Sequence, residues 1–452
     1  MTSEELFSLV NEGLGNSAYL LDLGDGRGLA VDPPLDLRAL RGAADRRGLR
    51  VAFVADTHLH ADFLTGARQL AVTDNATILA SAAGQRGFDH RGLTDGEEID
   101  LGGLTLRALA TPGHTDEHLS FLLLDDAKPV GVFTGGSLIV GSAARTDLMG
   151  NARAEELARA QYDSLHRLAA LPDATAVWPT HGAGSFCSAP AGAERITTIG
   201  HEKATNGLLG APDADAFIAR LLGGLGSYPA YFSRLAEINR RGPELVPGDV
   251  PLVGLTVSEV RRLLAEGAVA VDVRPAADVT AGHLPGAISI PLRAQFATWL
   301  GWLIDPGIPI VIIRNPDQNP ADIVWPALNI GFDRIVGELS GGMNAWIAAE
   351  YPVSTIRLVR PDQIAGEVLD VRQTSEYVAG HLPGAGHIEL GDLPQRVRTT
   401  TVKPAVVMCA SGVRALTAAS ILQRAGHHDV AVLIDSAAAW ARSTGRSLEE
   451  GA

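Results

Sequence analysis

The sequence predicts an α/β protein in which a two-sheet sandwich is followed by two smaller α/β domains with parallel sheets. Short apolar runs alternate with segments of helical spacing over residues 1–245, which favours two packed sheets with helices outside. Beyond residue 250, one set of short motifs occurs twice in the same order, which indicates a tandem repeat. The length of 452 residues agrees with about three domains.

The composition argues against several classes of protein. A formal charge of -15 without a Lys/Arg-rich run argues against a nucleic-acid surface. The acidic N-terminal stretch lacks the basic region of a signal peptide, and no apolar run approaches a membrane span of about 18 residues. Two cysteines, Cys187 and Cys409, are too few for a disulfide framework. We therefore expect a soluble, cytoplasmic protein with neither nucleic acid nor membrane as a partner.

The first unit is expected to open with a β-hairpin and to continue as strands mixed with helices. The expected strands are residues 19–23, 28–32, 51–55, 77–80, 104–110, 119–124, 130–134 and 176–179. The expected helices are residues 35–48, 154–171 and 214–223. Residues 205–250 are expected to form a helical extension closing in a Pro/Gly-rich linker, which places the first domain at residues 1–245.

Four histidines come directly after predicted strands, each in a turn: His58, His60, His114 and His181. A scaffold can gather ligands from distant parts of the sequence onto one rim in this way. Neutral imidazole suits iron or zinc. The pattern therefore predicts a metal site at one edge of the sandwich.

The motifs around these histidines resemble the metallo-β-lactamase fold. THLHAD, TPGHT, FTGGSL and PTHG occur in the order and spacing of that superfamily. Asn16-Ser17 before the hairpin, and ARTDL at residues 144–148, are more similar to persulfide dioxygenases than to thioester-cleaving glyoxalase II. The resemblance implies an αββα sandwich and an iron held by two histidines and one aspartate, which leaves positions open for substrate sulfur and O₂.

Two positions depart from that family pattern. Phe63 stands where the superfamily has a histidine, which agrees with the one-metal persulfide dioxygenases. Gly136 stands where the family has its aspartate ligand. Three outcomes stay open: a site of His58, His60 and His114 that holds Fe²⁺ or Zn²⁺, a site completed by Asp62, or a weak or empty site. His181 is a further candidate ligand.

Two other residues lie close to these motifs in the sequence. Arg145 could bind an anionic thiol cofactor as a fixed cation, or it could form a structural pair with Asp147. Cys187, near His181, is expected to be a small buried thiol. The remaining histidines of the first unit are expected on the surface or on helices: His90, His118, His166 and His201.

The repeat predicts two domains, at residues 250–352 and 353–452. Asp272-Val273-Arg274 followed by GHLPGA returns at Asp370-Val371-Arg372 with the same six residues after it. Each copy predicts a strand, an Asp-Val-Arg turn, a helix and a further strand and helix, which is typical of a parallel sheet. His283 and His381, within GHLPGA, are expected to be structural.

The second copy carries a cysteine between a strand and a helix. The apolar run 404–408 leads to CASGVR, from Cys409 through Gly412 to Arg414, and the helix after it is expected to end near Arg424. Loop amides and the helix dipole would favour the Cys409 thiolate and hold a transferred sulfur, while Arg414 fixes the loop or adds charge. Phosphatase loops have one more residue between cysteine and arginine, which favours sulfur over phosphate here. The two copies resemble rhodanese domains.

The first copy lacks the cysteine. Its equivalent run, residues 309–313, leads to RNPDQNP, in which two prolines disturb the loop. It keeps LSGGMNAW, which is similar to a rhodanese ending and indicates an intact fold. A docking or spacer role for this copy is our hypothesis.

The order of parts resembles bacterial persulfide dioxygenase–rhodanese fusions involved in sulfide detoxification. That resemblance implies oxidation of a low-molecular-weight thiol persulfide to sulfite at a mononuclear metal site. It also implies transfer of sulfane sulfur through a Cys409 persulfide, with sulfite and thiosulfate as further substrates, in a homo-oligomer. Two alternatives stay open: a zinc thioester hydrolase fused to rhodanese domains, and a sulfur carrier whose first domain is inactive.

Overall fold

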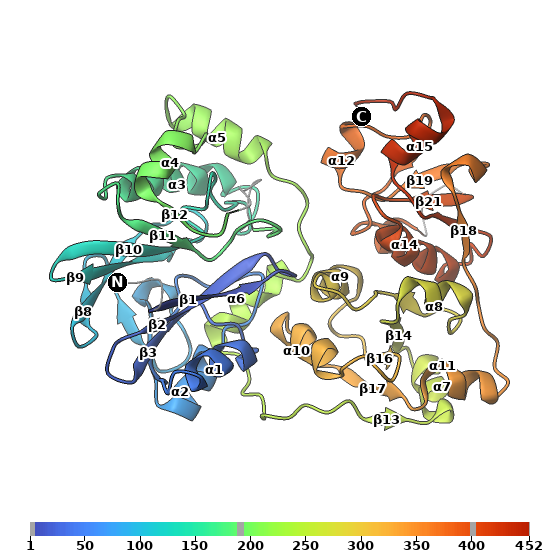
Figure 1. The fold of residues 1–452 in the computed structure, drawn as a ribbon, viewed down its shortest axis with the longest axis horizontal. Helices are drawn as coiled ribbons and strands as arrows, with labels where there is room; N and C mark the ends of the chain where they lie inside the picture. Colours follow the sequence, from blue (N-terminus) through green and yellow to red (C-terminus); the bar gives the residue numbers. More distant parts are fainter. Residues whose placement is uncertain (1–4, 188–193, 398–403, 452) are drawn as a thin grey trace. The chain divides into compact units, whose positions relative to one another are not determined.

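The computed structural model describes residues 5–187, 194–397 and 404–451 (Figure 1). By its internal contacts the chain forms two compact units. The first holds residues 1–248 with 328–331, and the second holds residues 249–327 with 332–452. Most residues of both repeat copies therefore lie in the second unit. The exact domain boundaries at residues 245–250 and 352–353 stay predictions.

The first sheet of the first unit has the order β1-β2-β3-β4-β5-β6. Its strands are β1 (Leu6–Asn11), β2 (Asn16–Asp22), β3 (Arg27–Val31), β4 (Arg50–Ala55), β5 (Thr77–Ser81) and β6 (Arg91–Leu93). Between them lie α1 (Arg38–Asp45), α2 (Ala67–Asp74) and the 3₁₀ turn η1 (Ala82–Gly84). Because β3, β4 and β5 run parallel, the residues that follow β3 and β4 meet at one edge of the sheet.

The second sheet has the order β12-β11-β10-β9-β8-β7. Its strands are β7 (Glu98–Asp100), β8 (Leu104–Ala110), β9 (Leu119–Asp125), β10 (Lys128–Gly135), β11 (Ala176–Pro179) and β12 (Thr197–Thr198). The helices that follow in this unit are α3 (Ala154–Ala169), α4 (Ile199–Thr205), α5 (Ala214–Gly223) and α6 (Phe232–Arg241). The ends of β8, β10 and β11 supply the loops that face the first sheet's edge.

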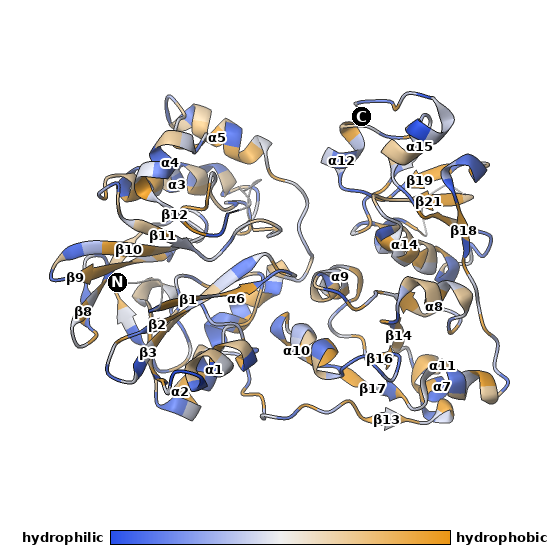
Figure 2. Cartoon of the chain, viewed as in Figure 1, coloured by the Kyte–Doolittle hydropathy of each residue, from blue (hydrophilic) through white to orange (hydrophobic). Residues whose placement is uncertain are grey.

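The apolar faces of the two sheets pack together, and helices cover the outer face of each. Tyr19 of β2 meets Phe133 of β10 with ring centroids 5.4 Å apart, inside a core that both sheets share. Leu40 of α1 packs under the first sheet, and Phe217 of α5 packs on the second. Each such side chain stabilises the fold by about 1.5–3 kcal/mol when buried. The result is an αββα sandwich, and Figure 2 shows the mixed hydropathy of its outer helices.

Every strand predicted for the first unit is present, with differences at some element ends, and the structure adds β1, α2 and α4, which were not predicted. The strand predicted at residues 28–32 ends at Val31, because Asp32 has a left-handed φ of 49°. The helix predicted at residues 35–48 is shorter, because the Asp36 carboxylate accepts the Arg38 amide and Gly48 turns the chain with a φ of 66°. β6, β7 and β12 have two or three residues each, which is too short for a periodic pattern.

The second unit contains two five-stranded sheets whose paired strands are all parallel. The first copy has the order β13 (Gly254–Leu255), β17 (Ile335–Leu339), β16 (Ile310–Ile313), β14 (Val269–Asp272) and β15 (Ile288–Ser289). Its helices are α7 (Val257–Ala265), α8 (Ala276–Ala281), α9 (Phe296–Leu303), α10 (Ala321–Asn329) and α11 (Gly342–Ala348).

The second copy repeats this sheet order with β18 (Arg357–Val359), β22 (Ala431–Leu433), β21 (Val406–Met408), β19 (Val368–Asp370) and β20 (Gly386–His387). Its helical elements are η2 (Pro361–Gln363), α12 (Thr374–Val378), α13 (Leu393–Arg396), α14 (Val413–Arg424) and α15 (Ala437–Thr444). The GHLPGA histidines serve the fold, since His283 and His381 each place Nδ1 2.9–3.0 Å from the carbonyl oxygen four residues earlier. The predicted fold class, including the parallel sheets, is confirmed.

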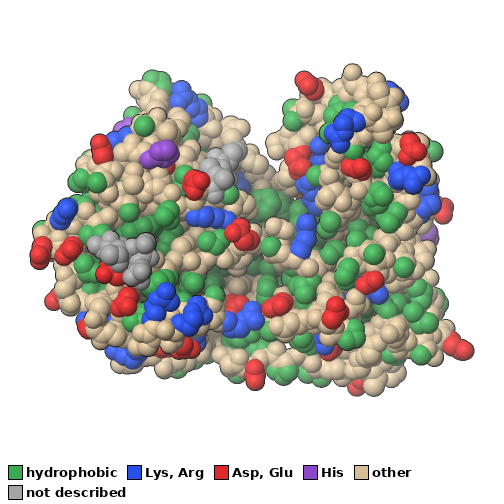
Figure 3. Space-filling model, viewed as in Figure 1, with side chains coloured by type: hydrophobic (Ala, Val, Ile, Leu, Met, Phe, Trp, Pro, Cys, Tyr) green, Lys and Arg blue, Asp and Glu red, His purple; other side chains and the backbone are tan. Residues whose placement is uncertain are grey.

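Helices of the described ranges are all too short or too polar to cross a membrane. On the face shown in Figure 3, Lys and Arg side chains are interspersed with Asp and Glu side chains.

Candidate metal centre and candidate sulfur-transfer site

The loop after β4 is fastened on several sides. Thr57 donates from its amide and its hydroxyl to the Asp32 carboxylate, at 2.7 Å each. Asn239 of α6 donates to the carbonyl oxygens of His60 and Phe63, at 2.8 and 2.9 Å. Asn239 is 1% exposed, so the helical extension clamps the His-x-His loop from outside the two sheets. Sequence patterns did not single out this asparagine.

The structure brings the predicted histidines together. The ring centroid of His58 lies 4.2 Å from that of His60, 4.8 Å from that of His114 and 5.3 Å from that of His181. All four rings are at most 1% exposed. Ligand atoms of His58, His60 and His181 lie within 4.8 Å of one another. The turns after β4, β8 and β11 therefore converge on one buried point.

In three of these imidazoles, a hydrogen bond holds one ring nitrogen, and the other ring nitrogen points away from that hydrogen-bond partner. The His58 Nδ1–H donates to Thr57 Oγ1, because that hydroxyl already donates to Asp32. His114 Nδ1–H donates to the Arg145 carbonyl oxygen at 2.7 Å, and His60 Nε2 lies 3.2 Å from Asp32. Metal-ligating histidines are oriented by hydrogen bonds of this kind.

The other nitrogens fit a metal ion. Among the described residues, His60 Nδ1 and His114 Nε2 are buried without a hydrogen-bond partner, as is Asp62 Oδ1. The Nε2 atoms of His58 and His181 lie 3.4 Å apart. That spacing is close to the roughly 3.3–3.4 Å expected for two nitrogens about 2.0–2.1 Å from one tetrahedral ion. Buried polar atoms left unpaired are costly, so a bound cation would relieve this cluster.

Burial also keeps these imidazoles in the neutral form that binds metal. Burial and the neighbouring histidines hold the pKa of His58 well below its usual value. Burial lowers the pKa of His114 and of His181 to about 3. His60 differs, because the Asp32 carboxylate outweighs burial and raises its pKa.

Phe63 and Gly136 change the site in different ways. The Phe63 ring stacks on His60 with centroids 4.1 Å apart, so it fills the place of the superfamily's further histidine with an apolar wall. A side chain on Gly136 would place its Cβ 2.5 Å from Cδ2 of His114. The His114 ring therefore occupies the space that an aspartate would need. Asp62 is one nearby carboxylate, with Oδ2 3.5 Å from His181 Nδ1, and burial raises its pKa.

His118 corrects one sequence expectation. We expected a surface or helix histidine, but His118 is 1% exposed and stacks on His58 with centroids 5.1 Å apart. Its Nε2 accepts the Gly136 amide at 3.0 Å, and its Nδ1 lies 2.9 Å from Thr111 Oγ1. With both nitrogens engaged, His118 forms a wall of the cluster and orders the loop after β10.

Arg145 is 2% exposed and engaged on several sides. Its guanidinium makes two hydrogen bonds to the Asp147 carboxylate, at 2.7 and 2.8 Å, and lies over the Tyr228 ring. The structural alternative for Arg145 is thus present, and its contact with a substrate stays a prediction. Cys187 is fully buried, as expected, and burial raises the pKa of its thiol well above the usual value.

A second candidate site surrounds Cys409. This residue follows β21, and its Sγ accepts the Gly412 amide at 3.1 Å and the Ala415 amide at 3.4 Å. Gly412 has a φ of 85°, a left-handed conformation that favours glycine and turns the loop around the sulfur. Amides of the loop and of the first turn of α14 therefore point at Cys409, as the sequence predicted.

Arg414 leaves this loop to form an ion pair. Its guanidinium donates two hydrogen bonds to Glu376 of α12, at 2.6 and 2.7 Å. The pair fastens the first turn of α14 to α12, which favours the loop-holding role over the role of a free charge.

The comparisons with known proteins agree with this geometry. The rhodanese-like domain family matches residues 256–349 and 357–443. A hydroxyacylglutathione hydrolase of Methylococcus capsulatus is 38% identical over 37% of this chain, and the chain spans 62% of its length, less than two thirds. The human mitochondrial persulfide dioxygenase ETHE1 is 30% identical over 42% of this chain and 69% of its own.

A solved structure extends the agreement beyond the sandwich. A metallo-beta-lactamase from Staphylococcus aureus has a TM-score of 0.65 and 28% sequence identity, and covers 74% of this chain and 98% of its own. The shared region exceeds the first unit alone, which agrees with a fusion architecture. The chain therefore belongs to the metallo-β-lactamase-fold family that includes persulfide dioxygenases and hydroxyacylglutathione hydrolases, in a form fused to two rhodanese-like domains.

Proposed function

We propose that the first unit oxidises a low-molecular-weight thiol persulfide to sulfite at a mononuclear metal. The balanced reaction is RSSH + O₂ + H₂O → RSH + SO₃²⁻ + 2H⁺. The observation that carries the proposal is the buried imidazole cluster, in which His60 Nδ1 and His114 Nε2 have no partner among the described residues. The similarity to a persulfide dioxygenase supports this choice of substrate.

His58, His60, His114 and His181 would hold the metal, and Asp62, whose Oδ1 has no hydrogen-bond partner among the described residues, is the candidate carboxylate. When bound, an iron ion would supply the centre at which persulfide sulfur and O₂ meet. The chain's own part is to keep the His58, His114 and His181 imidazoles neutral by burial and to fix the orientation of His58, His60 and His114 through Thr57, Asp32 and the Arg145 carbonyl. Phe63 and His118 exclude water from two sides of the cluster.

We propose that Cys409 carries sulfane sulfur. Its thiolate would attack thiosulfate, forming an S–S bond to the outer sulfur and releasing sulfite with the bonding electrons: Cys–S⁻ + S₂O₃²⁻ → Cys–S–S⁻ + SO₃²⁻. In the reverse direction, sulfite takes the sulfur from Cys409. The Gly412 and Ala415 amides support the negative charge in either direction. Sulfite made by the first unit is thus a substrate for the second.

The test uses the full chain with measurement of metal content, O₂ uptake and sulfite formed from glutathione persulfide. We expect about one iron per chain, and His58→Ala or His114→Ala to lose at least about tenfold in metal affinity and in O₂ uptake. His166→Ala, on the outside of α3, is the matched control and should behave as wild type. Wild-type protein that holds no metal and consumes no O₂ would refute the first activity.

One alternative has its own supporting observation. The His114 ring stands where the family's aspartate would lie, and a hydroxyacylglutathione hydrolase is among the relatives, so zinc held by histidines could serve hydrolysis of thioesters. Zinc content with thioesterase activity and no O₂ uptake would support that reading. Absence of metal, with thiocyanate formed from thiosulfate and cyanide, would support a sulfur carrier with an inactive first unit.

A further inference from the structure

The first rhodanese-like copy lies against the helix that follows Cys409. Gln423 of α14 contacts His283 at 3.1 Å, and Arg424 donates to the Gly286 carbonyl oxygen at 2.7 Å. Ser420 Oγ, one turn earlier, accepts the Ser289 amide at 3.0 Å. Between Gly286 and Ser289 of the first copy, the contact thus moves from the end of α14 one turn back toward its beginning.

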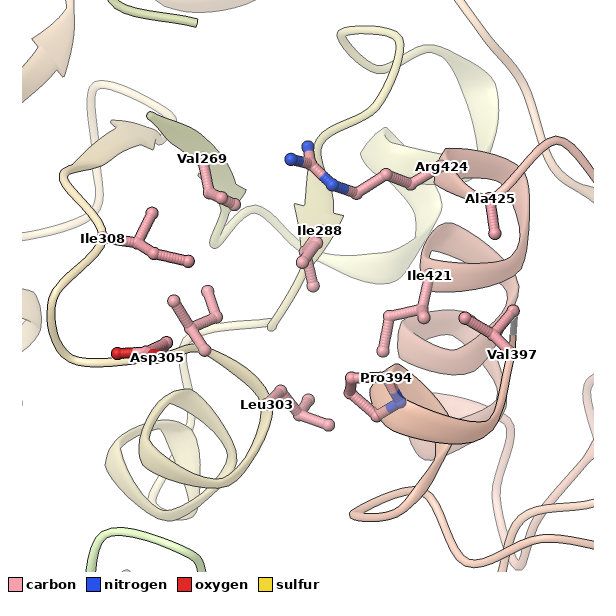
Figure 4. A pocket seen from close by; sticks show the side chains of 11 residues that line it. Val269, Ile288, Leu303, Asp305, Ile308, Pro394, Val397, Ile421, Arg424 and Ala425 are labelled. Carbon is pink, nitrogen blue, oxygen red and sulfur yellow. The ribbon is translucent and has the colours of Figure 1, made fainter. Parts of the chain in front are cut away.

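The cavity between the two copies is also lined by residues of the first copy that face α14 of the second. It has a volume of about 440 Å³, and Figure 4 shows Ile288 of β15 facing Ile421 of α14 across it. At the other side, Trp302 of α9 lies so close to Gly391 that a Cβ there would be 2.1 Å from its indole nitrogen. Residues 288–302 of the first copy are therefore held between two fixed contacts on the second copy.

Arg293 lies within this held segment. The seven residues from Ser420 back to Val413 span about 10 Å of helix. Residues 292 and 293 form a bend, so the four residues from Ser289 to Arg293 span less than the roughly 13 Å of an extended chain, and the long Arg293 side chain adds to that reach. Arg293 can therefore reach the beginning of α14, where the Cys409 loop lies. Electrostatics agrees, since partial burial lowers the pKa of Arg293, the Cys409 sulfur raises it and Arg414 lowers it.

The charge of Arg293 is available to a ligand. Arg414 is neutralised by its two hydrogen bonds to Glu376. Among the described residues, by contrast, no carboxylate pairs with Arg293, which is exposed. Sulfite and a Cys409 persulfide are both anionic, so their reaction brings together three negative charges and needs an added cation nearby.

We infer that Arg293, from the copy without a cysteine, forms part of the Cys409 site and binds the anionic sulfur acceptor or donor. The ligand class is a small sulfur oxyanion such as sulfite or thiosulfate. In the reaction, sulfite forms a bond to the outer sulfur of the Cys409 persulfide, the Sγ–S bond breaks, and its electrons stay on Sγ. The first copy thereby contributes a wall and a charge to the site of the second. This inference rests on the proposed sulfur transfer.

A charge series at Arg293 in the full chain tests it. Arg293→Gln should raise KM for thiosulfate about ten- to hundredfold, the value of one charge-assisted hydrogen bond, while Arg293→Lys stays near wild type. Arg262→Gln, an exposed arginine on α7 of the same copy, is the matched control and should change nothing.

Alkylation of Cys409 gives a readout that a structural role would not move. In wild type, anionic iodoacetate should be favoured relative to neutral iodoacetamide, and this preference should fall in Arg293→Gln and reverse in Arg293→Glu. Equal changes with both reagents, or no change along the series, would overturn the inference. If wild type alkylates as expected but transfers no sulfur, the proposed activity fails while the position of Arg293 stands.

Discussion

The two rhodanese-like copies keep one scaffold and differ where a reaction would occur. In the first, Arg274 pairs with Asp272 and donates to the Gly282 carbonyl oxygen at 2.8 Å. In the second, Arg372 pairs with Asp370 and donates to Gly380 at the same distance. This buried arginine connects the end of the strand to the end of the following helix. The Asp-Val-Arg motif therefore serves the fold in both copies.

The difference begins one residue after the fourth strand in chain order, which is β16 in the first copy and β21 in the second. Asp272 pairs with Ile313 and Asp370 pairs with Met408, so the sheet register places Arg314 where the second copy has Cys409. Arg314 makes two hydrogen bonds to Glu338 and donates to the Gln318 carbonyl oxygen at 2.9 Å. The first copy therefore fills with its own side chains the space in which the second presents amides to a sulfur. Retention of the scaffold does not require retention of the chemistry.

The largest expected effect comes from removing the sulfur itself. Cys409→Ser should lower thiocyanate formation from thiosulfate and cyanide by at least about 10³-fold, since a nucleophile has no substitute in the reaction. O₂ uptake with persulfide should stay unchanged, because the metal cluster lies in the first unit.

Cys187 provides an internal control for that variant. Its thiol is fully buried and burial raises its pKa well above the usual value, so little thiolate is present and folded Cys409→Ser should be alkylated far more slowly than wild type. Residual sulfur transfer above about 10% of wild type would mean that a group other than Cys409 carries the sulfur.

A cysteine placed in the first copy tests whether its loop could support the reaction. Arg314→Cys in a Cys409→Ser background should restore less than about 1% of wild-type transfer. The loop is closed by Gln318, whose side chain accepts the Asn315 amide and donates to the Val273 carbonyl oxygen, at 2.8 Å each. Because Glu338 would lose its partner, stability should also fall by about 1–3 kcal/mol in chemical denaturation.

The new thiol should react with iodoacetamide more slowly than Cys409 of wild type, since the Arg314 side chain is only 17% exposed and Gln318 closes the loop around it. Recovery of transfer near the wild-type level would show that position alone, without the loop of the second copy, is sufficient.

The sequence predicted the parts of both sites that depend on strand ends. His58, His60, His114 and His181 each follow a strand, and the strands pair so that these ends converge. Cys409 and Gly412 were predictable for the same reason, because a strand, a glycine and a helix fix the loop locally. Their roles in catalysis and metal binding stay predictions.

The spacing of apolar residues in the sequence could not predict contacts between distant segments. His118 precedes its strand, and its burial depends on the stacking with His58 from another strand end. Asn239 lies on a helix far along the chain, yet it clamps the loop that carries His60. Arg293 acquires a neighbour in the other copy only because residues 288–302 dock on α14. None of these side chains belongs to a motif that spacing could reveal.

The smallest expected effect comes from the Glu376–Arg414 ion pair of the second copy. Its removal tests whether Arg414 holds the loop or takes part in the chemistry. Glu376→Gln keeps an acceptor for the Gln373 amide but removes the charge that faces Arg414. Transfer should fall about two- to fivefold and stability by about 0.2–1 kcal/mol, because the pair is partly exposed. Glu266→Gln, in an exposed pair on α7, should change neither quantity.

The pH dependence gives the sign of this contribution. Burial opposes ionisation of Glu376, but the hydrogen bonds and charge of Arg414 outweigh it and lower the pKa of the carboxyl. The stabilisation is therefore fully present above the unfolded value of about 4.3 and is lost as the pH falls through the lower folded value. Wild type and Glu376→Gln should differ in denaturation at pH 6–8 and converge in acid. A constant difference down to about pH 3 would show that Glu376 acts through packing and not through its charge on Arg414.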